Sequence, residues 1–311
     1  MKDTRESLVA SMIWRDTPHP AERQGARARE WGASKLPAKA KISPAEAVRL
    51  MDDLTTIVAR AAALISALSP ATVEQRTKDD QSPVTAADEA SEAAILEGLT
   101  RLMPGMRVIS EESAVPQTPA LIEGSFFIVD PLDGTKEFLK GSDEFAVLLG
   151  IVTDGVPIAG IVAGPNRGQV WRGVVGHGAE RLRLLPDGAD QAQPIHARPW
   201  PGESAIAMVS RSHYDPKTDA FLKPFGAIQH DSCGSALKFA LIAEGSADIY
   251  PRLGTTCEWD VAAGHALIAA AGGTVLSPEG GPLHFGHADR NFRLPAFVAW
   301  GDPAKAAAMK S

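Results

Sequence analysis

The chain has 311 residues, of which 44% are hydrophobic and 22% are charged, which suits a globular protein of one large or two smaller domains. Its formal net charge of -7 at pH 7 argues against a general binder of nucleic acid or of anionic membranes. The sequence contains nothing close to the roughly 20 consecutive apolar residues of a membrane span, so we expect no integral membrane segment.

Residues 1–44 differ from the rest because they mix Arg, Lys, Ala and Pro without a sustained period. This composition predicts a flexible, loosely attached extension rather than a functional arm. The first residues also lack a compact apolar core followed by a small-residue cleavage site, so we do not expect secretion. Two cysteines, Cys233 and Cys257, are too few for a disulfide framework and favour reduced thiols in a cytoplasm.

Two helices are predicted at the start of the folded part. Ser43 and Pro44 suit an N-cap and a first helical turn, and apolar residues then recur at helical spacing over 45–68. A second helix is predicted over 87–102, and its inward-facing residues are expected to be Ile95, Leu96 and Leu99.

Short strands follow in the next part of the chain. MRVIS and SFFIVD read as buried strands, and residues 145–165 read as two strands joined by an Asp-Gly turn. The strand-and-turn pattern continues over 168–182, and a polar region rich in Pro and Gly is predicted near 186–204.

The last third mixes both kinds of element. Strands are predicted over 204–210 and 247–253, and helices over 235–246 and 259–273, the second of which ends in glycines that suit a C-cap. We therefore predict a mixed α/β protein, with helices layered on sheets. Two lobes are expected, an α+β lobe over 45–200 and an α/β lobe over 201–311.

The segment IVDPLDGTKEF, residues 128–138, reads as a strand that leads into a helix. Its junction carries Asp130 and Asp133, whose charges repel one another, so an isolated pair would tend to keep a proton. A divalent metal between them reverses this effect, and ligands that are all oxygen suit a hard cation such as Mg²⁺. Gly134 and Thr135 then open the helix, whose free N–H groups would lie ready for a phosphate.

More acids lie at similar junctions, and each has an alternative interpretation when taken alone. Asp88 and Asp260 precede helical stretches and suit N-caps, whereas Glu111 and Glu112 suit a solvated loop. Asp133 followed by glycine also suits an ordinary turn. The recurrence of acids at the ends of elements nevertheless favours a metal site, and together they indicate a Mg²⁺-dependent phosphate enzyme.

Four segments carry a family resemblance: SPVTAAD (82–88), EES (111–113), DPLDGT (130–135) and WDVAAGHALIAAAGG (259–273). In this order they resemble the inositol monophosphatase superfamily of magnesium-dependent, lithium-sensitive phosphatases, from about residue 45 to the C-terminus. The resemblance implies a sandwich of alternating helix and sheet layers of the inositol-monophosphatase and fructose-bisphosphatase type. Ser110 departs from the glycine common in the family, and we expect little consequence because serine is small.

The resemblance also implies roles for residues of this chain. Asp88 and Thr135 would orient and activate the attacking water, and Glu111 would belong to the catalytic machinery as well as to the metal site. Two or three Mg²⁺ ions would be bound by the side chains of Glu111, Asp130, Asp133 and Asp260 and by the backbone carbonyl of Leu132.

Further segments indicate the substrate. KDDQSPVT (78–85), SRSH (210–213), GSALKF (234–239) and AEGSADIYPR (243–252) resemble the 3'(2'),5'-bisphosphate nucleotidases, in particular their bacterial type. That subfamily removes the 3'-phosphate from adenosine 3',5'-bisphosphate, a by-product of sulfate activation. The implied substrate-binding residues are Gly134, Thr135, His213, Ser235, Lys238, Arg252 and Asp260.

Several alternatives remain open at this point. Lys238 suits an exposed helix position, His213 a loop position, and Asp80 either an outer metal shell or a solvated loop. Cys233 and Cys257 suit buried inert thiols more than redox sites, and neither lies in a zinc-ligand pattern. The rival activity is that of an inositol-1-phosphatase, and a third reading is a catalytically silent regulator that binds a nucleotide or a metal. A homodimer, and turnover of the 5'-phosphosulfate analogue, are further candidates.

Overall fold

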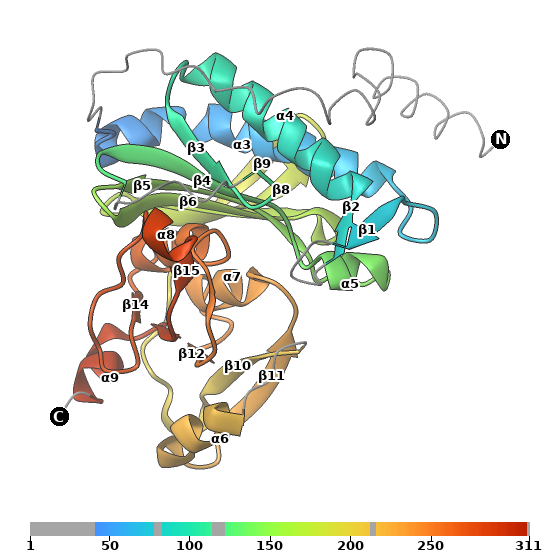
Figure 1. Cartoon of the computed structure of the whole chain (residues 1–311). Helices are drawn as coiled ribbons and strands as arrows, with labels where there is room; N and C mark the ends of the chain where they lie inside the picture. Colours follow the sequence, from blue (N-terminus) through green and yellow to red (C-terminus); the bar gives the residue numbers. More distant parts are fainter. Residues whose placement is uncertain (1–40, 78–82, 114–121, 212–215, 310–311) are drawn as a thin grey trace.

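The computed structural model describes residues 41–77, 83–113, 122–211 and 216–309 of the chain. Helices and sheets alternate in layers, with α3 and α4 over one face of a large sheet and α7 and α8 beneath its other face (Figure 1). A smaller sheet follows below α7 and α8, and its far face packs against α6 and α9. The predicted layered fold is therefore confirmed.

The two helices predicted first are α3 (Pro44–Ala67) and α4 (Ala86–Leu102). Ser43 caps α3 through a reciprocal capping box with Glu46, and Pro44 occupies its first turn, as predicted. Thr85 caps α4, which begins at Ala86, one residue before the predicted start. Ile95 and Leu99 of α4 are buried against the sheet, whereas Leu96 is only half-buried, because it lies farther round the helix.

The large sheet has seven strands in chain order. The β3–β4 pair is parallel, and every other neighbouring pair is antiparallel. The Asp-Gly turn predicted between two strands is confirmed at Asp154 and Gly155, both with positive φ. The strands are β3 (Arg107–Ser110), β4 (Ser125–Asp133), β5 (Ala146–Thr153), β6 (Val156–Gly164), β7 (Gln169–Val174), β8 (Gly178–Leu185) and β9 (Gly188–Ile195).

Strand β9 lies in the stretch that the sequence predicted as a polar connection. All its residues except Ile195 are half-buried or exposed, and it forms the edge of the sheet, so the apolar alternation that identifies a half-buried strand is missing.

Alternation along β4 divides the hydrophobic core. Phe126 and Ile128 point towards the layer of α7 and α8, whereas Phe127 and Val129 point towards α3 and α4. All four side chains are at most 1% exposed, which explains why this segment reads as a continuous apolar run. Full burial of each such side chain contributes roughly 1.5–3 kcal/mol to stability.

The smaller sheet has the strand order β11-β10-β12-β16-β14. β10 pairs in parallel with β11 and β12, whereas β16 pairs antiparallel with β12 and β14. Its elements are β10 (Ile206–Ser210), α6 (Pro216–Leu222), β11 (Gln229–Cys233), α7 (Leu237–Ala243), β12 (Ile249–Arg252), α8 (Ala262–Ala270), β14 (Thr274–Leu276), β16 (Phe297–Trp300) and α9 (Pro303–Ala308).

Helices α7 and α8 are shorter than predicted. The residues before each helix form turns instead, and these turns carry Ser235 and Asp260 into the functional region. The glycine C-cap predicted for α8 is present, because Gly272 has a φ of 97° and the Gly273 N–H donates to the Ile268 carbonyl.

Close packing seats α8 on the large sheet. A Cβ at Gly160 would lie 2.1 Å from the Ala263 carbonyl oxygen, so only glycine lets the helix backbone approach β6 this closely. This contact carries the start of α8, which follows Asp260, over the sheet that carries the other acids.

The remaining elements are short. A hairpin precedes α4, a five-residue helix follows β4, and a two-stranded ribbon lies beside the start of α8. These elements are β1 (Gln75–Thr77), β2 (Pro83–Thr85), α5 (Thr135–Leu139), β13 (Thr256–Cys257) and β15 (Arg293–Leu294), together with the 3₁₀ turns η1 (Pro165–Arg167), η2 (Gly202–Ser204), η3 (Lys223–Phe225) and η4 (Ala288–Arg290).

The predicted extension lies mostly outside the described residues, so the flexibility of 1–40 stays a prediction. Ile42 already packs against the large sheet, because its N–H donates to Ser125 Oγ at 2.7 Å and its side chain is 4% exposed. The division into two lobes near residue 200 also stays a prediction. The two sheets come from either side of that point, but α7 and α8 cover the large sheet. Within the described ranges, no helix combines the length and the apolar character needed to cross a membrane.

Candidate active site

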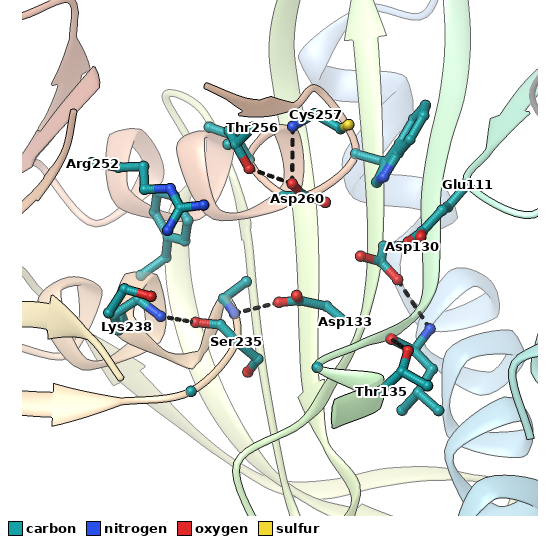
Figure 2. A pocket seen from close by; sticks show the side chains of 18 of the residues that line it. Glu111, Asp130, Asp133, Thr135, Ser235, Lys238, Arg252, Thr256, Cys257 and Asp260 are labelled. Carbon is teal, nitrogen blue, oxygen red and sulfur yellow. Dashed lines mark hydrogen bonds between the residues drawn. The ribbon is translucent and has the colours of Figure 1, made fainter. Parts of the chain in front are cut away.

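A pocket of about 850 Å³ opens where β4 ends and the turns before α7 and α8 begin. Carboxylates line one end of it, and the cations Lys238 and Arg252 line the other (Figure 2). Asp133 and Asp260 lie between the two groups in this view. The pocket therefore brings together residues from both sheets.

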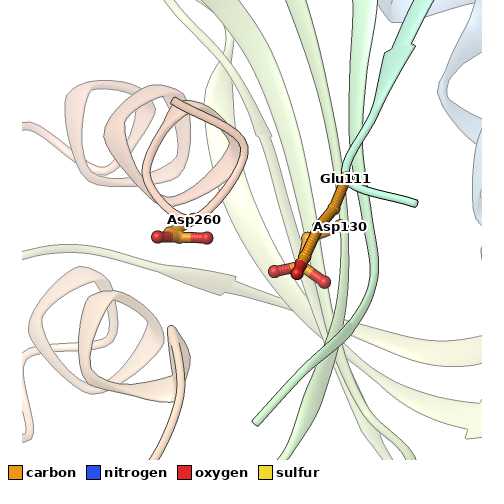
Figure 3. Close-up of side chains that lie close together, drawn as sticks. All are labelled: Glu111, Asp130 and Asp260. Atoms are coloured by element: carbon orange, nitrogen blue, oxygen red, sulfur yellow. The ribbon is translucent and has the colours of Figure 1, made fainter. Parts of the chain in front are cut away.

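Three carboxylates converge at the acidic end. Glu111 directly follows β3, Asp130 lies in β4, and Asp260 precedes α8 (Figure 3). One carboxylate oxygen from each residue lies within 4.8 Å of those from the other two. The parallel pairing of β3 with β4 explains the first contact, because it places Ser110 beside Val129 and so sets Glu111 next to Asp130.

An irregularity in β4 shapes the segment 130–135, which is called the metal motif below. The pairing with β5 shifts between Asp130 and Asp133, so the two carboxylates and the Leu132 carbonyl need not alternate between the faces of the sheet. Asp130 Oδ1 accepts the Leu132 N–H at 3.0 Å, and an oxygen of Asp133 accepts the N–H of Ala236 from the other side of the pocket. Asp133 therefore joins the metal motif to the turn before α7.

Burial and mutual repulsion raise the pKa values of these acids, so without a bound cation the carboxylates tend to stay protonated. Burial, followed by the charges of Glu111 and Asp133, raises the pKa of Asp130 well above its usual range. Burial and the nearby Asp260 raise the pKa of Asp133 to about 7. The pKa of Asp260 is also raised, mainly by burial. A hard divalent cation removes this repulsion, and the donors are all oxygens, so the site fits Mg²⁺.

Thr135 and Asp88 form a hydrogen-bonded pair beside this cluster. Thr135 Oγ1 lies 3.0 Å from Asp88 Oδ1 and 3.2 Å from the Leu132 carbonyl oxygen, and it can donate its single proton to either. Burial raises the pKa of Asp88, which is 1% exposed. The pair is positioned to share a proton.

Asp88 also belongs to a capping box, so part of the capping interpretation is correct. Its Oδ2 accepts hydrogen bonds from the N–H and the hydroxyl of Thr85, although Thr85 itself is the N-cap. The second oxygen of Asp88 is thus left for Thr135.

The capping interpretation is wrong for Asp260. The N-cap position of α8 is Val261, which makes no side-chain capping bond. Asp260 Oδ2 instead accepts hydrogen bonds from the Thr256 hydroxyl and from the Cys257 N–H, the latter at 2.9 Å. The ribbon of β13 and β15 therefore holds this carboxylate in place towards the cluster.

The structure separates the two adjacent glutamates, both of which are half-buried. Glu111 lines the pocket, whereas Glu112 lines a separate hollow along α4. Ser110, in the position of the family's glycine, is 1% exposed, and its hydroxyl makes no hydrogen bond within the described residues.

Lys238 is not the exposed helix lysine that its sequence position allowed. Its side chain is buried, and its Nζ donates to the Cys233 carbonyl at 3.0 Å and to the Ser235 carbonyl, as Figure 2 shows for the latter. Burial lowers the pKa of Lys238, and the charge of Asp133 opposes that shift. Lys238 thus faces the pocket as a fixed donor, together with Arg252 at the end of β12.

Gly134 and Ser235 shape the floor of the pocket with left-handed backbones. Gly134 has a φ of 96° and Ser235 a φ of 50°. The helix predicted after Gly134, α5, has only five residues, so its dipole is a smaller attraction for phosphate than the sequence suggested. Asp80 and His213 lie outside the described residues.

The sequence did not identify the wall made by Tyr250, Trp259, Phe292 and Arg293, all of which line the pocket. Arg252 and Arg293 both act to lower the pKa of Asp260, against the raising effect of burial. No periodicity or motif marked Arg293, because it enters the pocket only through the pairing of β15 with β13.

Comparison with known proteins identifies the family of the chain. The model of the inositol monophosphatase family matches residues 46–305. The chain belongs to the inositol monophosphatase family. The match covers both sheets and every described residue of the pocket.

Individual family members narrow the similarity. The chain is 39% identical over 221 residues to the 3'(2'),5'-bisphosphate nucleotidase CysQ of Salmonella typhimurium, which covers 68% of this chain and 83% of that protein. It is 40% identical over 209 residues to the protein of that name from Escherichia coli (strain K12), and this match covers 67% of this chain and 82% of that protein. The crystal structure of CysQ from Bacteroides thetaiotaomicron superposes with a TM-score of 0.66 at 29% identity and covers 81% of this chain and 97% of that one.

Proposed function

We propose that this chain is a Mg²⁺-dependent phosphatase that hydrolyses the 3'-phosphate of adenosine 3',5'-bisphosphate to give AMP and phosphate. The observation that carries the proposal is the pocket itself, which has clustered carboxylates at one end and Lys238 and Arg252 at the other. A nucleotide with two phosphates would place the phosphate that is cleaved at the acidic end and the other phosphate at the basic end. The relatives at 39% and 40% identity are named for this reaction.

The acidic end provides the proposed metal site. Its ligands are the carboxylates of Glu111, Asp130, Asp133 and Asp260 and the Leu132 carbonyl, which suit two or three Mg²⁺ ions. Magnesium bound there supplies positive charge against the charge that develops on the phosphoryl oxygens, and it makes a bound water more acidic.

Thr135 and Asp88 are proposed to handle the proton of the attacking water. Thr135 Oγ1 accepts a hydrogen bond from that water while donating its own proton to Asp88 Oδ1 at 3.0 Å. The raised pKa of Asp88, which follows from its burial, makes this carboxylate a better proton acceptor than an exposed aspartate. Glu111 shares this end of the pocket and is proposed to act with them.

The basic end is proposed to hold the 5'-phosphate, which is not cleaved. Arg252 can donate two hydrogen bonds to a phosphate, and Lys238 presents its ammonium group from a fixed position. Gly134 and Ser235 offer backbone and hydroxyl groups along the floor, and His213 is proposed to belong to the same nucleotide site.

The proposed role of this enzyme is to remove a nucleotide by-product of sulfate assimilation. The 5'-phosphosulfate analogue has the same 3'-phosphate and is proposed as a second substrate. The cytoplasm is the proposed compartment, because Cys233 and Cys257 are free thiols. A homodimer stays a prediction.

Phosphate release tests the proposal. With Mg²⁺ present, we expect turnover of adenosine 3',5'-bisphosphate to exceed that of 3'-AMP and of inositol 1-phosphate. Preference for inositol 1-phosphate would assign the rival inositol-1-phosphatase activity. Binding of the bisphosphate without any phosphate release would assign a silent regulator.

A further inference from the structure

Glu144 connects the two halves of the pocket without being one of the described residues that line it. It lies in the loop between α5 and β5, just beyond the metal motif, and is 7% exposed. Its Oε2 accepts the Gly234 N–H at 2.8 Å, and its Oε1 pairs with the Arg211 guanidinium at 2.9 Å. One buried carboxylate thus holds two segments that belong to the smaller sheet.

The first of these segments is the turn that carries Ser235. A Cβ at Gly234 would lie 2.8 Å from the Glu144 carbonyl oxygen, so the turn and the Glu144 loop touch backbone to backbone. Ser235 then adopts a φ of 50°, which is unfavourable for a residue with a side chain and persists only where neighbours enforce it. Glu144 is one of the groups that enforce it.

Two other groups hold the same turn, and both face the pocket. Asp133 accepts the N–H of Ala236, and Lys238 donates to the carbonyls on either side of Gly234. Asp133 and Lys238 are proposed to bind metal and substrate respectively, whereas Glu144 holds the turn from outside the pocket lining.

The second segment begins at Arg211, which directly follows β10. Besides pairing with Glu144, its guanidinium donates to the Ser232 carbonyl at 2.8 Å. Arg211 therefore joins the end of β10 to the end of β11. The proposed nucleotide residue His213 follows two positions later.

We propose that Glu144 is a positioning residue for the nucleotide, which fixes the Gly234–Ser235 turn and Arg211 relative to the metal motif. The inference rests on the proposed function. The Glu144 carboxylate bonds to the Gly234 N–H and to Arg211 and makes no hydrogen bond or ion pair with a proposed metal ligand among the described residues, so we infer that it acts on nucleotide affinity rather than on metal binding. Its removal would leave a buried N–H and a guanidinium without their carboxylate.

The test measures KM, kcat and the Mg²⁺ concentration for half-maximal rate in Glu144→Ala, with adenosine 3',5'-bisphosphate as substrate. We expect KM to rise about tenfold or more, kcat to change less than about threefold, and the Mg²⁺ requirement to stay the same. Glu144→Gln keeps an acceptor for Gly234 but loses the ion pair, so its KM should lie between those of the wild type and of the alanine variant.

A double-mutant cycle with Arg211→Ala adds a readout that general destabilisation does not reproduce. Arg211→Ala should raise KM in the wild type and have little further effect in the Glu144→Ala background. Glu244→Ala is the matched control. It removes another carboxylate that pairs with an arginine, Arg181 at 3.3 Å. Glu244 is half-buried, directly follows α7 and does not line the pocket. This substitution should lower thermal stability and leave KM unchanged.

An unchanged KM in Glu144→Ala would overturn the proposal, as would a fall in kcat accompanied by a higher Mg²⁺ requirement. If the alanine variant does not fold, the KM values of Glu144→Gln and Arg211→Ala test the proposal instead. An unchanged KM in both variants would overturn the positioning role of Glu144. The wild-type assay separates the two levels of inference. Absence of nucleotide turnover by wild-type protein contradicts the proposed function, whereas normal wild-type turnover with unaltered variants contradicts only the role of Glu144.

Discussion

The two ends of the pocket are built in different ways. The acidic end is built mainly on the large sheet. Glu111 directly follows β3, Asp130 lies in the neighbouring strand β4, and Asp133 and Thr135 lie within five residues of Asp130, whereas Asp260 comes from the turn before α8. The basic end combines Lys238 of helix α7 with Arg252 at the end of β12, and these two residues meet only through folding. We expect the acidic end to set the rate for every substrate and the basic end to set the choice among substrates.

Loss of a carboxylate at the acidic end should have the largest effect. We expect Asp133→Asn to lower kcat/KM about a thousandfold, or ~4 kcal/mol, for the bisphosphate and for 3'-AMP alike. The reason is that the asparagine keeps the size of the side chain but loses the charge that the metal requires. Phosphate release by purified protein, with folding checked by circular dichroism, measures it.

Removal of the metal should have the same consequence in the wild type. A chelator is expected to abolish phosphate release, and added Mg²⁺ is expected to restore it. Full turnover by folded Asp133→Asn, or activity that survives chelation, would contradict the assignment of the acidic end.

The proton-handling pair should have the next largest effect. Thr135→Ala removes the hydroxyl that lies 3.0 Å from Asp88, and we expect kcat to fall about a hundredfold for every substrate, in the range typical of general acid–base groups. Thr135→Ser restores the hydroxyl and should recover most of the rate. A serine variant as slow as the alanine variant would show that the methyl packing of Thr135, rather than its proton, matters.

A change at the basic end should discriminate between substrates. We expect Arg252→Ala to lower kcat/KM for adenosine 3',5'-bisphosphate by about tenfold to a hundredfold and barely to change that for 3'-AMP, which lacks the 5'-phosphate. Arg290→Ala removes an exposed arginine outside the pocket lining and serves as the charge-matched control. Equal losses on both substrates would make Arg252 structural and remove the distinction between the two ends.

Lithium should inhibit the enzyme at the acidic end, with a smaller effect on turnover than the substitutions described above. Li⁺ is close to Mg²⁺ in size but carries half its charge, so it can occupy a metal position without stabilising the developing charge fully. We expect Li⁺ to inhibit at concentrations where Na⁺ has little effect, and to do so for every substrate. A dose series in which the two ions act equally would count against this expectation.

The smallest effect on turnover is expected at His265 of α8, which is not among the residues that line the pocket. Burial lowers the pKa of His265 from 6.5 to about 4, so the unfolded chain binds the extra proton between those values. Stability is therefore complete above about pH 6.5 and falls as the pH drops towards 4, by up to ~3 kcal/mol.

Denaturant unfolding at pH 5 and pH 7 measures this dependence. In His265→Gln the stability difference between the two pH values should shrink, whereas the exposed His177→Gln should behave like the wild type. Identical pH dependence in all three proteins would mean that His265 titrates normally in the folded state.

The acidic end was readable from the sequence because strand-end aspartates, a following glycine and a threonine lie within six residues at 130–135. Such a motif fixes its own geometry, since a few backbone angles determine where each side chain points. Helix α3 was readable for the same reason, as its capping box and apolar spacing are local. The edge strand β9 was missed because it has little apolar alternation to detect.

The sequence by itself thus determined the layered fold, the acids of the metal motif and the family resemblance. Only the tertiary structure decided that Asp260 is held by the β13–β15 ribbon and does not cap α8, and that Lys238 is buried between two carbonyls. It alone placed Arg293 in the pocket and made Glu144 a link between the sheets. The physical reason differs between these contacts. Glu144 and Arg293 meet segments far apart in the chain, which only folding brings together. Asp260 and Lys238 are held by backbone groups three and five residues away, and every residue carries such groups, so no residue pattern marks these contacts in advance.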